Sequence, residues 1–443
     1  MEVLFGTDGV RGRANENLTP EFALKLGLAV GSFLKRDCSK IILGKDTRLS
    51  SDMLESAFAA GLCAAGMEVL ETGVITTPGV AFLASFNNVY GAVISASHNP
   101  FDENGIKLIH KNGFKLPDEW EEEIEKIFLD NGFEYAPSAE IGKRTAFHQG
   151  ASLYKDFLKS KADFSLKGMK LVVDTANGAG HNIAPALLRE LGADVIVIND
   201  TPDGKNINRD CGAVHPERMA EEVKKHRAML GISLDGDGDR AIFADEQGEI
   251  IYGDGILYIF ATYMMEKGIL RGPVVTTYMT NSGVEMALAK RGIKMVRVPI
   301  GDKYVARKMK EIGATLGGEQ SGHIILFQHL PTGDGILTTL QLLKVILEKG
   351  KPLSQLKDYV LFPQKLVNIK VKNPQKWEKD EKVMAVVRTA ESALAGKGRI
   401  LIRASGTEDK LRIMVEGEDE KEVENLTNEL YERIKKIVES END

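Results

Sequence analysis

The chain has 443 residues, and its 43% hydrophobic and 27% charged content is typical of water-soluble globular proteins, which excludes a fibrous or disordered chain. Its net charge of −7 argues against nucleic acid or an anionic membrane as the main partner, and no run reaches the roughly 20 apolar residues of a membrane span. The N-terminus lacks a secretory signal pattern, and Cys38, Cys63 and Cys211 lack metal-ligand spacing. We therefore expect a cytoplasmic protein with several domains.

Three segments share one local pattern, in which an apolar run breaks into a Gly-rich or polar turn and continues at helical spacing. They begin at Lys40, Lys170 and Pro273, and a second β-rich run follows each of them. Strand–helix–strand order of this kind predicts parallel sheets covered by helices. We therefore expect three similar α/β domains with mainly parallel mixed sheets.

The last part of the chain has a different pattern. Strand-like runs at 366–371, 399–403 and 410–415 precede a long charged helix over about 421–438. This order predicts a small C-terminal α+β domain with an antiparallel sheet. The expected domains are 1–150, 151–252, 253–366 and 367–443.

Ser97 lies in a polar turn that follows a short apolar strand. Pro100 biases Asn99 away from the helical region, which keeps the turn a loop. The chain returns through an Asn-Gly turn at 104–105, and this would bring Lys107 back towards Ser97. Taken alone, Ser97 with His98 is more often a solvent-facing turn, because no hydrolase signature accompanies the pair.

Three aspartates alternate with glycines in the segment from Asp235 to Arg240, at the end of an apolar strand. In an extended chain these three carboxylates share a face, and such a cluster needs a cation or protons to be neutralised. Hard oxygen ligands favour Mg²⁺ or Ca²⁺ over zinc. An EF-hand is excluded because its sixth position, which needs Gly, is Arg240. A purely structural acidic turn stays the alternative.

Two further loops carry polar groups suited to a phosphorylated sugar. Glu319 and Ser321 alternate in the Gly-rich segment 317–323 and could bind vicinal hydroxyls, although an incidental acid in a Gly-rich turn is equally common. The segment 403–408 offers a guanidinium, two hydroxyls and a Gly turn, which together make an anion cradle. A polar hairpin loop is the plain alternative for this segment. The cations that an anionic substrate needs are Arg11, Lys107, Lys303, Arg403 and Arg412.

Together these motifs resemble the α-D-phosphohexomutase superfamily, in the same order over essentially the whole chain. The motifs are FGTDGVRG, SASHNP, DGDGDR, GGEQSGH, PTGDG and SGTE. Within the superfamily the chain is most similar to the bacterial branch that makes cell-wall precursors from glucosamine phosphates. The resemblance implies four domains around a central cleft. It also implies an isomerase that interconverts glucosamine 6-phosphate and glucosamine 1-phosphate through a phosphoserine enzyme and a 1,6-bisphosphate. Mutases of mannose or glucose phosphates with the same mechanism are the alternative.

The resemblance also implies a role for each motif residue. Ser97 would carry the phosphate and would bind one Mg²⁺ together with Asp235, Asp237 and Asp239. Residues placed to assist phosphoryl and proton transfer would be Arg11, His98, Lys107 and His323. Residues that contact the sugar or its second phosphate would be Lys303, Glu319, Ser321, Arg403, Ser405, Gly406, Thr407 and Arg412. The ligand would be a hexosamine phosphate, with a hexose 1,6-bisphosphate as activator, and a homodimer is compatible with the resemblance.

One departure and three rival functions qualify this interpretation. Ala404 and Asp409 stand where the family loop usually has prolines, which predicts a less rigid loop and weaker phosphate binding. A dinucleotide-binding fingerprint beginning at Asp174 fails at its third glycine position, which is Ile183. A silent sugar-phosphate-binding protein and a phosphatase are the other rivals. Retention of the serine, the lysine and all three aspartates argues against the silent protein, and phosphate release without isomerisation would reveal a phosphatase.

Overall fold

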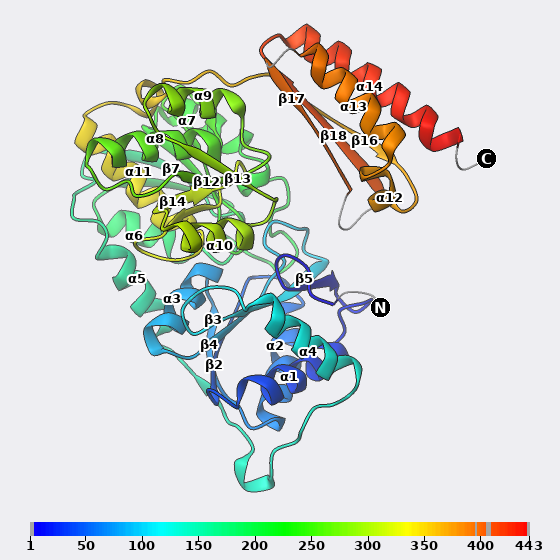
Figure 1. Cartoon of the computed structure of the whole chain (residues 1–443). Coiled ribbons are helices and arrows are strands. Elements are labelled where there is room, and N and C mark those ends of the chain that lie inside the picture. The colour runs from blue at the N-terminus through cyan, green and yellow to red at the C-terminus, as the bar shows by residue number, and fades with distance from the viewer. Residues whose placement is uncertain (1–3, 395–396, 405–408, 441–443) are drawn as a thin grey trace. The chain divides into compact units, whose positions relative to one another are not determined.

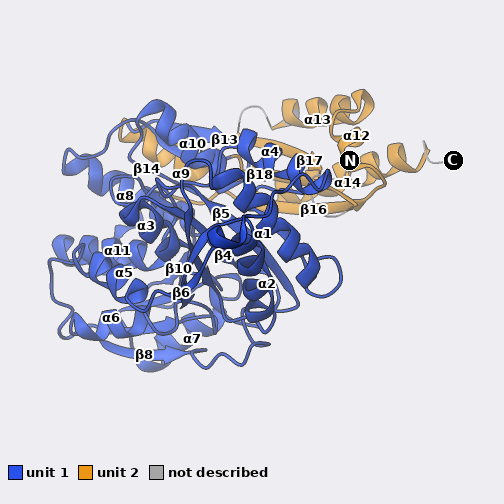
Figure 2. Ribbon diagram, turned by 90° about the horizontal axis from the view of Figure 1, so that it is seen from below, with its two compact units in different colours: residues 1–277, 293–357 blue, residues 278–292, 358–443 orange. Residues whose placement is uncertain are grey.

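The computed structural model describes residues 4–394, 397–404 and 409–440 of the chain (Figure 1). The chain forms two compact units (Figure 2). The first comprises Met1–Thr277 with Ile293–Lys357, and the second comprises Tyr278–Gly292 with Asp358–Asp443. Three sheets belong to the first unit and one to the second. None of the helices in the described part of the chain combines the length and the apolar composition needed to cross a membrane.

The first sheet has six strands in the order β1-β5-β4-β2-β3-β6. The strands are β1 (Val10–Arg13), β2 (Lys40–Lys45), β3 (Glu68–Val74), β4 (Tyr90–Ile94), β5 (Glu103–Ile109) and β6 (Arg144–Ala146). β2, β3, β4 and β6 are parallel, whereas β5 is antiparallel to both of its neighbours. The accompanying helices are α1 (Pro20–Leu34), α2 (Ser51–Ala64), α3 (Thr77–Asn87), α4 (Asp118–Leu129), α5 (Gly150–Lys159) and the short η1 (Ser138–Glu140).

The core of this sheet follows from its sequence. Ile41, Ile42 and Leu43 form an uninterrupted buried run on β2, as expected for a strand covered on both faces. α1 begins where the Thr19 side chain accepts a hydrogen bond from a backbone amide of the first turn. α1 and α2 approach closely at Gly61, where a Cβ atom would lie 2.1 Å from the carbonyl oxygen of Leu24.

The second sheet has five strands in the order β11-β10-β9-β7-β8. The strands are β7 (Lys170–Asp174), β8 (Asp194–Ile198), β9 (Leu230–Leu234), β10 (Ala241–Ala244) and β11 (Ile250–Ile251). The helices are α6 (Ala184–Glu190), η2 (Gly212–Val214) and α7 (Glu217–His226). β7 is parallel to β8 and β9, and β9 to β11 form an antiparallel meander.

The third sheet has four strands in the order β13-β12-β14-β15. The strands are β12 (Val274–Thr277), β13 (Met295–Val298), β14 (Leu316–Gly318) and β15 (Ile324–Leu326). The helices of this part of the first unit are α8 (Gly253–Glu266), α10 (Asp302–Ile312), α11 (Gly335–Lys349) and η3 (Leu353–Leu356). α9 (Ser282–Lys290) lies between β12 and β13 in the sequence but belongs to the second unit.

The three sheets share one arrangement of four strands. In each, a first strand (β2, β7 or β12) lies between two parallel neighbours, and the third strand of the set turns back through an antiparallel hairpin. The first strands begin at or next to the three positions where the repeated sequence pattern starts. The prediction of three similar α/β domains with mainly parallel mixed sheets is therefore confirmed.

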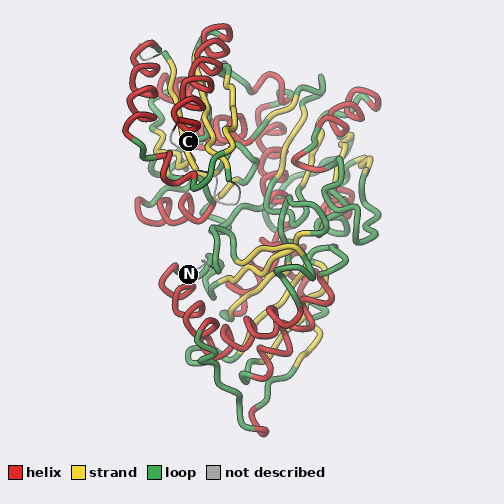
Figure 3. The backbone as a smooth tube through the Cα atoms, turned by 90° about the vertical axis from the view of Figure 1, so that its right-hand side faces the viewer, coloured by secondary structure: helices red, strands yellow, loops and turns green. Residues whose placement is uncertain are grey.

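The second unit contains an antiparallel sheet in the order β16-β18-β17. Its elements are β16 (Gln364–Lys370), α12 (Pro374–Glu378), α13 (Glu381–Ala393), β17 (Gly398–Ala404), β18 (Lys410–Gly417) and α14 (Glu420–Ser440). Figure 3 shows the long helices running beside the strands. Leu411, Ile413 and Val415 alternate along β18 and are buried with Trp377 and Ile434. The predicted small α+β domain is confirmed, whereas the predicted joints near 150, 252 and 366 and the cleft among four domains stay predictions.

Candidate active site

Three hairpin loops of the first unit carry half of the residues predicted for the site. They connect β4 to β5, β9 to β10 and β14 to β15, and so occupy the same place in each of the three similar sheets. Side-chain contacts join the first loop to the second (Ser97 to Asp235) and the second to the third (Asp239 to His323). The repeated fold therefore brings together side chains that are far apart in the sequence.

Ser97 lies on the first of these loops and is buried, not facing solvent as the plain interpretation of the turn would require. Its hydroxyl donates a hydrogen bond of 2.7 Å to Oδ2 of Asp235, a residue 138 positions away. The Nδ1 atom of His98 lies 3.4 Å from the same hydroxyl. Ser97 has φ of 55°, a left-handed conformation that is uncommon for residues other than glycine. Strain of this kind is concentrated at functional sites in proteins.

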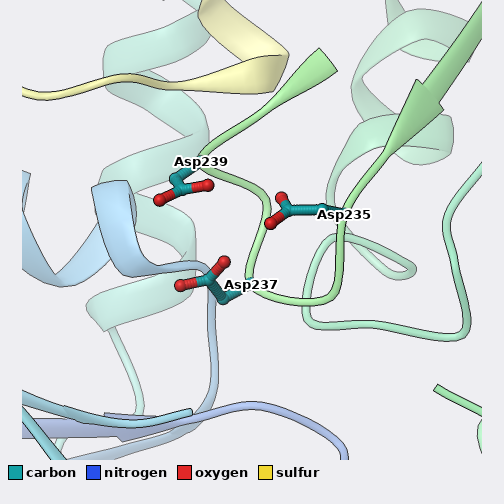
Figure 4. A group of neighbouring side chains, drawn as sticks. All are labelled: Asp235, Asp237 and Asp239. Atoms are coloured by element: carbon teal, nitrogen blue, oxygen red, sulfur yellow. The ribbon is translucent and has the colours of Figure 1, made fainter. Parts of the chain in front are cut away.

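The second loop presents three carboxylates to a common space (Figure 4). Asp235, Asp237 and Asp239 are all buried, and one oxygen from each lies within 4.8 Å of the others. The loop is flanked by the strands β9 and β10 and not by the helices of an EF-hand, which agrees with the exclusion of an EF-hand from the sequence. A Cβ atom at Gly236 would lie 2.5 Å from the carbonyl oxygen of Ser97, which explains why the residue between the first two carboxylates has no side chain.

The carboxylates differ in their electrostatic surroundings. Burial, together with the negative charges of Asp239 and Asp237, raises the pKa of Asp235 well above its ordinary value. Burial and the charge of Asp237 likewise raise the pKa of Asp239. Burial would also raise the pKa of Asp237, but the charge of Lys107 and the hydrogen bonds from Lys107 and Thr77 together lower that pKa.

Lys107 lies on β5 and connects this loop to the start of the chain. Its ammonium group lies 2.8 Å from Asp237 and 2.8 Å from Asp8. Asp8 also pairs with Arg11, and with Lys115 at 2.6 Å. The β4–β5 hairpin turns Lys107 back as predicted, but its ammonium group contacts these two carboxylates and not Ser97.

The third loop holds Glu319, Ser321 and His323. Glu319 accepts a hydrogen bond of 3.2 Å from the backbone amide of Gly301, and burial raises the pKa of its carboxyl group. The Nε2 atom of His323 lies 3.9 Å from Asp239 and accepts a hydrogen bond of 3.2 Å from Gly333. His323 is thus beside the aspartate loop, whereas Ser321 borders a separate space.

That space is a cavity of about 430 Å³ beside the first two loops. It is lined by His98, Ala213, Val214, Arg240, Ile242, Tyr252, Gln320 and Ser321. Burial, followed by the positive charges of Arg240 and Arg11, lowers the pKa of His98 to about 3. His98 is therefore neutral at physiological pH, and its lowered pKa makes it a weak proton acceptor.

The remaining predicted residues lie elsewhere. Lys303 on α10 lies 3.1 Å from Asp118 on α4 and lines a second cavity, of about 490 Å³, that His323 also borders. Arg403 and Arg412 are paired across β17 and β18 in the second unit, where burial and Arg412 lower the pKa of Arg403. Ser405, Gly406 and Thr407 lie outside the described residues.

Comparison with known protein families gives four matches that follow one another along the chain. All four models describe phosphoglucomutase/phosphomannomutase domains: alpha/beta/alpha domain I at residues 2–135, domain II at 152–248, domain III at 252–361 and the C-terminal domain at 366–433. The chain belongs to the phosphoglucomutase/phosphomannomutase family. The predicted superfamily is therefore confirmed, and with it the prediction of an isomerase.

Curated relatives of this phosphohexomutase extend over its full length. The phosphoglucosamine mutases of Carboxydothermus hydrogenoformans and Desulforamulus reducens are each 47% identical to it, over 99% of this chain and 100% of theirs. Among solved structures, a phosphoglucomutase/phosphomannomutase family protein from Burkholderia thailandensis has a TM-score of 0.83 at 24% identity, covering 98% of this chain and 97% of the other. An Aspergillus fumigatus N-acetylphosphoglucosamine mutase, solved with GlcNAc-6P and magnesium, has a TM-score of 0.72 at 18% identity, covering 98% and 96%. The two structures establish the shared fold.

Several residues that contact the candidate site were missed in the sequence. Asp8 pairs with Lys107, and the Thr77 hydroxyl donates a hydrogen bond to Asp237. Arg48 and Asn208 both donate hydrogen bonds to the carbonyl oxygen of Ser97. A signal was present for Arg48, because it follows β2 in the polar segment at the carboxyl end of a parallel strand, where ligand sites of α/β proteins occur. Nothing local distinguished the others.

The aspartate loop fits a divalent cation. Oδ1 of Asp237 and Oδ1 of Asp239 are buried and accept no hydrogen bond from any described residue. Oxygen atoms left without donors among three like charges are the surroundings that a hard cation such as Mg²⁺ satisfies. The three aspartates therefore form a buried triad suited to a metal ion.

Proposed function

We propose that this phosphohexomutase interconverts glucosamine 6-phosphate and glucosamine 1-phosphate by means of a phosphoserine at Ser97. The hydrogen bond from Ser97 to Asp235 carries the proposal, because it puts the Ser97 hydroxyl in direct contact with the buried aspartate triad. The choice of glucosamine rests on the relatives named phosphoglucosamine mutase, which match over their full length.

One Mg²⁺ would be held by Asp235, Asp237 and Asp239 together with an oxygen of the Ser97 phosphate. When bound, the ion supplies positive charge that offsets the charge of the transferring phosphoryl group. Lys107 and Arg240 add positive charge beside the same carboxylates.

The reaction needs two phosphoryl transfers, one from Ser97 to the sugar and one from the sugar back to Ser97. In the first, a sugar hydroxyl oxygen forms a bond to the phosphorus of phosphoserine while the bond from phosphorus to Oγ of Ser97 breaks. The proton of the sugar hydroxyl leaves, Oγ gains a proton, and the product is the 1,6-bisphosphate. In the second, Oγ of Ser97 forms a bond to the phosphorus of the other phosphate while the bond from that phosphorus to the sugar oxygen breaks. The Oγ proton leaves, the sugar oxygen gains a proton, and the enzyme regains its phosphate and releases the isomeric monophosphate.

Residues of this chain would serve these steps as follows. Arg11, His98, Lys107 and His323 would assist phosphoryl and proton transfer. The Nδ1 atom of His98 lies 3.4 Å from Oγ of Ser97, and Nε2 of His323 lies 3.9 Å from Asp239. Glu319 and Ser321 would bind sugar hydroxyls. Lys303, Arg403, Ser405, Gly406, Thr407 and Arg412 would hold the phosphate that is not reacting. Two phosphate sites are required because the bisphosphate turns round between the steps.

A parallel turnover assay tests the substrate. Purified enzyme with Mg²⁺ and a hexose 1,6-bisphosphate activator is given glucosamine 6-phosphate, glucose 1-phosphate or mannose 1-phosphate in separate reactions. We expect the highest kcat/KM with glucosamine 6-phosphate. A higher value with either neutral sugar would replace the substrate assignment by a phosphoglucomutase or phosphomannomutase with the same mechanism. Phosphate release without isomerisation would identify a phosphatase.

We also expect a cytoplasmic enzyme. Cys38, Cys63 and Cys211 are free thiols, which is the state that a reducing compartment maintains. A homodimer is compatible with the family, and sedimentation of the purified enzyme measures the assembly directly.

A further inference from the structure

Arg48 follows β2 and is buried, with 3% of its surface exposed. An arginine side chain has five N–H donors, and every one of them is used here. Nε donates to Asp46 at 2.8 Å, and the four remaining donors, on the two terminal nitrogens, all point to backbone carbonyl oxygens. An arginine in a surface salt bridge rarely has all five of its N–H donors in hydrogen bonds to protein atoms.

The four carbonyl oxygens belong to one short stretch, the loop that carries Ser97. One terminal nitrogen donates to Ser97 at 2.8 Å and to Asn99 at 2.9 Å. The other donates to Glu103 at 2.9 Å and to Pro100. The guanidinium group therefore occupies the inside of the turn between β4 and β5.

The backbone conformation of this loop depends on donors for its carbonyl oxygens. Ser97 has φ of 55°, and its carbonyl group is turned into the protein. A buried carbonyl oxygen without a donor is costly, and a left-handed residue other than glycine persists only where its surroundings enforce it. Without the guanidinium group, four carbonyl oxygens of this loop would lose a donor together.

A second set of contacts reinforces the same conformation. Asn208 lies between β8 and η2, in the segment that contains the second sheet. Its side chain donates hydrogen bonds to the carbonyl oxygens of Ser97 at 2.9 Å and Asn99 at 3.0 Å. The Ser97 amide donates to the Ser95 hydroxyl at 2.9 Å, and that hydroxyl donates to Asp46 at 2.6 Å. Asp46 in turn accepts a hydrogen bond from Arg48, so Arg48, Asp46, Ser95 and Ser97 are joined in one continuous hydrogen-bond network.

We infer that Arg48, supported by Asn208, is a positioning residue that holds the Ser97 loop in the conformation from which the Ser97 hydroxyl meets Asp235. The inference rests on the proposed function for its catalytic consequence, but the geometry of the loop is independent of it. Arg48 does not contact Oγ, so its effect on phosphoryl transfer passes through the loop. A displacement of about 1 Å at a reacting group lowers rates by about 100-fold.

Substitution by lysine tests the geometry, because lysine keeps the charge but has only three donors on a single nitrogen. Hydrogen–deuterium exchange of peptides covering residues 95–103 should be at least about tenfold faster in Arg48→Lys than in wild type. Arg144→Lys on β6 of the same sheet is the matched control, since Arg144 contacts Glu71 and not the loop. Leu62→Ala, in the buried core of α2, controls for lost stability alone. Unchanged exchange in Arg48→Lys, or equal acceleration in Leu62→Ala, would overturn the inference.

Steady-state kinetics with glucosamine 6-phosphate test the consequence. We expect kcat per folded molecule to fall about 100-fold in Arg48→Lys while KM changes less than about threefold, because the proposed sugar and phosphate contacts lie on other loops. Transfer of label from a radioactive hexose 1,6-bisphosphate to Ser97 should slow by the same factor. Asn208→Ala, which removes donors from two of the same carbonyl groups, should give a smaller effect in the same direction and replaces Arg48→Lys if that variant does not fold.

Hydrogen–deuterium exchange and steady-state kinetics together distinguish a failure of the positioning role from a failure of the proposed function. Faster exchange of the loop with unchanged kcat would disprove the positioning role even though the contacts are real. An inactive wild-type enzyme would instead remove the proposed function, and the exchange experiment would still decide whether Arg48 holds the loop.

Discussion

The ammonium group of Lys107 lies 2.8 Å from Oδ2 of Asp237, and both side chains are almost completely buried. The pairing lowers the pKa of Asp237, against the effect of burial, and Asp237 and Asp8 together raise the pKa of Lys107 despite its burial. Both groups are thus charged inside the protein, and each neutralises the other. This pair connects the first sheet to the aspartate loop of the second.

Removing one partner of this pair should be costly for stability and for activity. In Lys107→Met, Asp237 remains buried without its cation, whereas the partly exposed Asp8 keeps Lys115, and we expect a loss of about 3–5 kcal/mol in the free energy of unfolding. Urea denaturation measures this loss. The double variant Lys107→Met/Asp237→Asn should recover part of it, because the uncompensated charge is removed. Lys308→Met, at an exposed pair, is the control and should change stability by less than about 0.5 kcal/mol.

Ser97→Ala should lose nearly all mutase activity and keep the fold, since the change deletes one hydroxyl that bonds to Asp235. A coupled mutase assay and circular dichroism measure the two properties. Mass spectrometry of the wild-type enzyme should find phosphate on Ser97 and not on Ser95. Ser85→Ala, at an exposed position, should retain full activity. Substantial turnover by Ser97→Ala would rule out the phosphoserine mechanism.

Asp239→Asn should distinguish two effects of the Asp239 carboxylate: binding of Mg²⁺, and destabilisation of the metal-free protein by a buried negative charge. Burial and Asp237 raise the pKa of Asp239, so the stability that its protonated form contributes is lost as pH rises through the pKa of the folded state. Without Mg²⁺ at pH 7, the variant should therefore be more stable than wild type by on the order of 1 kcal/mol. Wild type should gain thermal stability on adding Mg²⁺, and the variant should gain much less.

Calorimetric titration with Mg²⁺ gives the matching affinities. Asp130→Asn, exposed at the end of α4, should bind Mg²⁺ like wild type. Equal Mg²⁺ affinity in Asp239→Asn and wild type would show that Asp239 is not a ligand.

Glu121 on α4 should make stability depend on pH. Burial raises the pKa of its carboxyl group to about 7, with Lys303 opposing the effect and Asp118 adding to it. The stability contributed by the protonated form is complete below about pH 4.3, the ordinary pKa of Glu, and is lost as pH rises through 7. Glu121→Gln should therefore match wild type near pH 4.5 and be more stable by about 1–3 kcal/mol at pH 8.

Denaturation curves from pH 4.5 to 8.5 measure this difference. Glu119→Gln, an exposed position on the same helix, should show no such pH dependence. A constant difference between Glu121→Gln and wild type across the range would mean that Glu121 is charged throughout.

Much of the fold could be predicted from local patterns. The three repeated strand–turn–helix segments correspond to β2, β7 and β12, and the alternating pattern of the last 80 or so residues corresponds to the small α+β domain. The aspartate loop was also predictable, because three carboxylates two residues apart crowd together whatever surrounds them. The charged terminal helix, expected over about 421–438, spans Glu420–Ser440.

The sequence by itself determined the repeated α/β units, the aspartate loop and the family, because each depends on local spacing or on the order of motifs. Only the tertiary structure decided that Ser97 contacts Asp235, that Lys107 pairs with Asp237 and Asp8, and that Arg48 fills the turn beneath Ser97. These contacts join residues on different strands and sheets, so they depend on strand order and on how the hairpins pack. Local sequence carries no record of that packing: the position of Arg48 after β2 marks it as a candidate, but its hydrogen-bond partners are set by the fold.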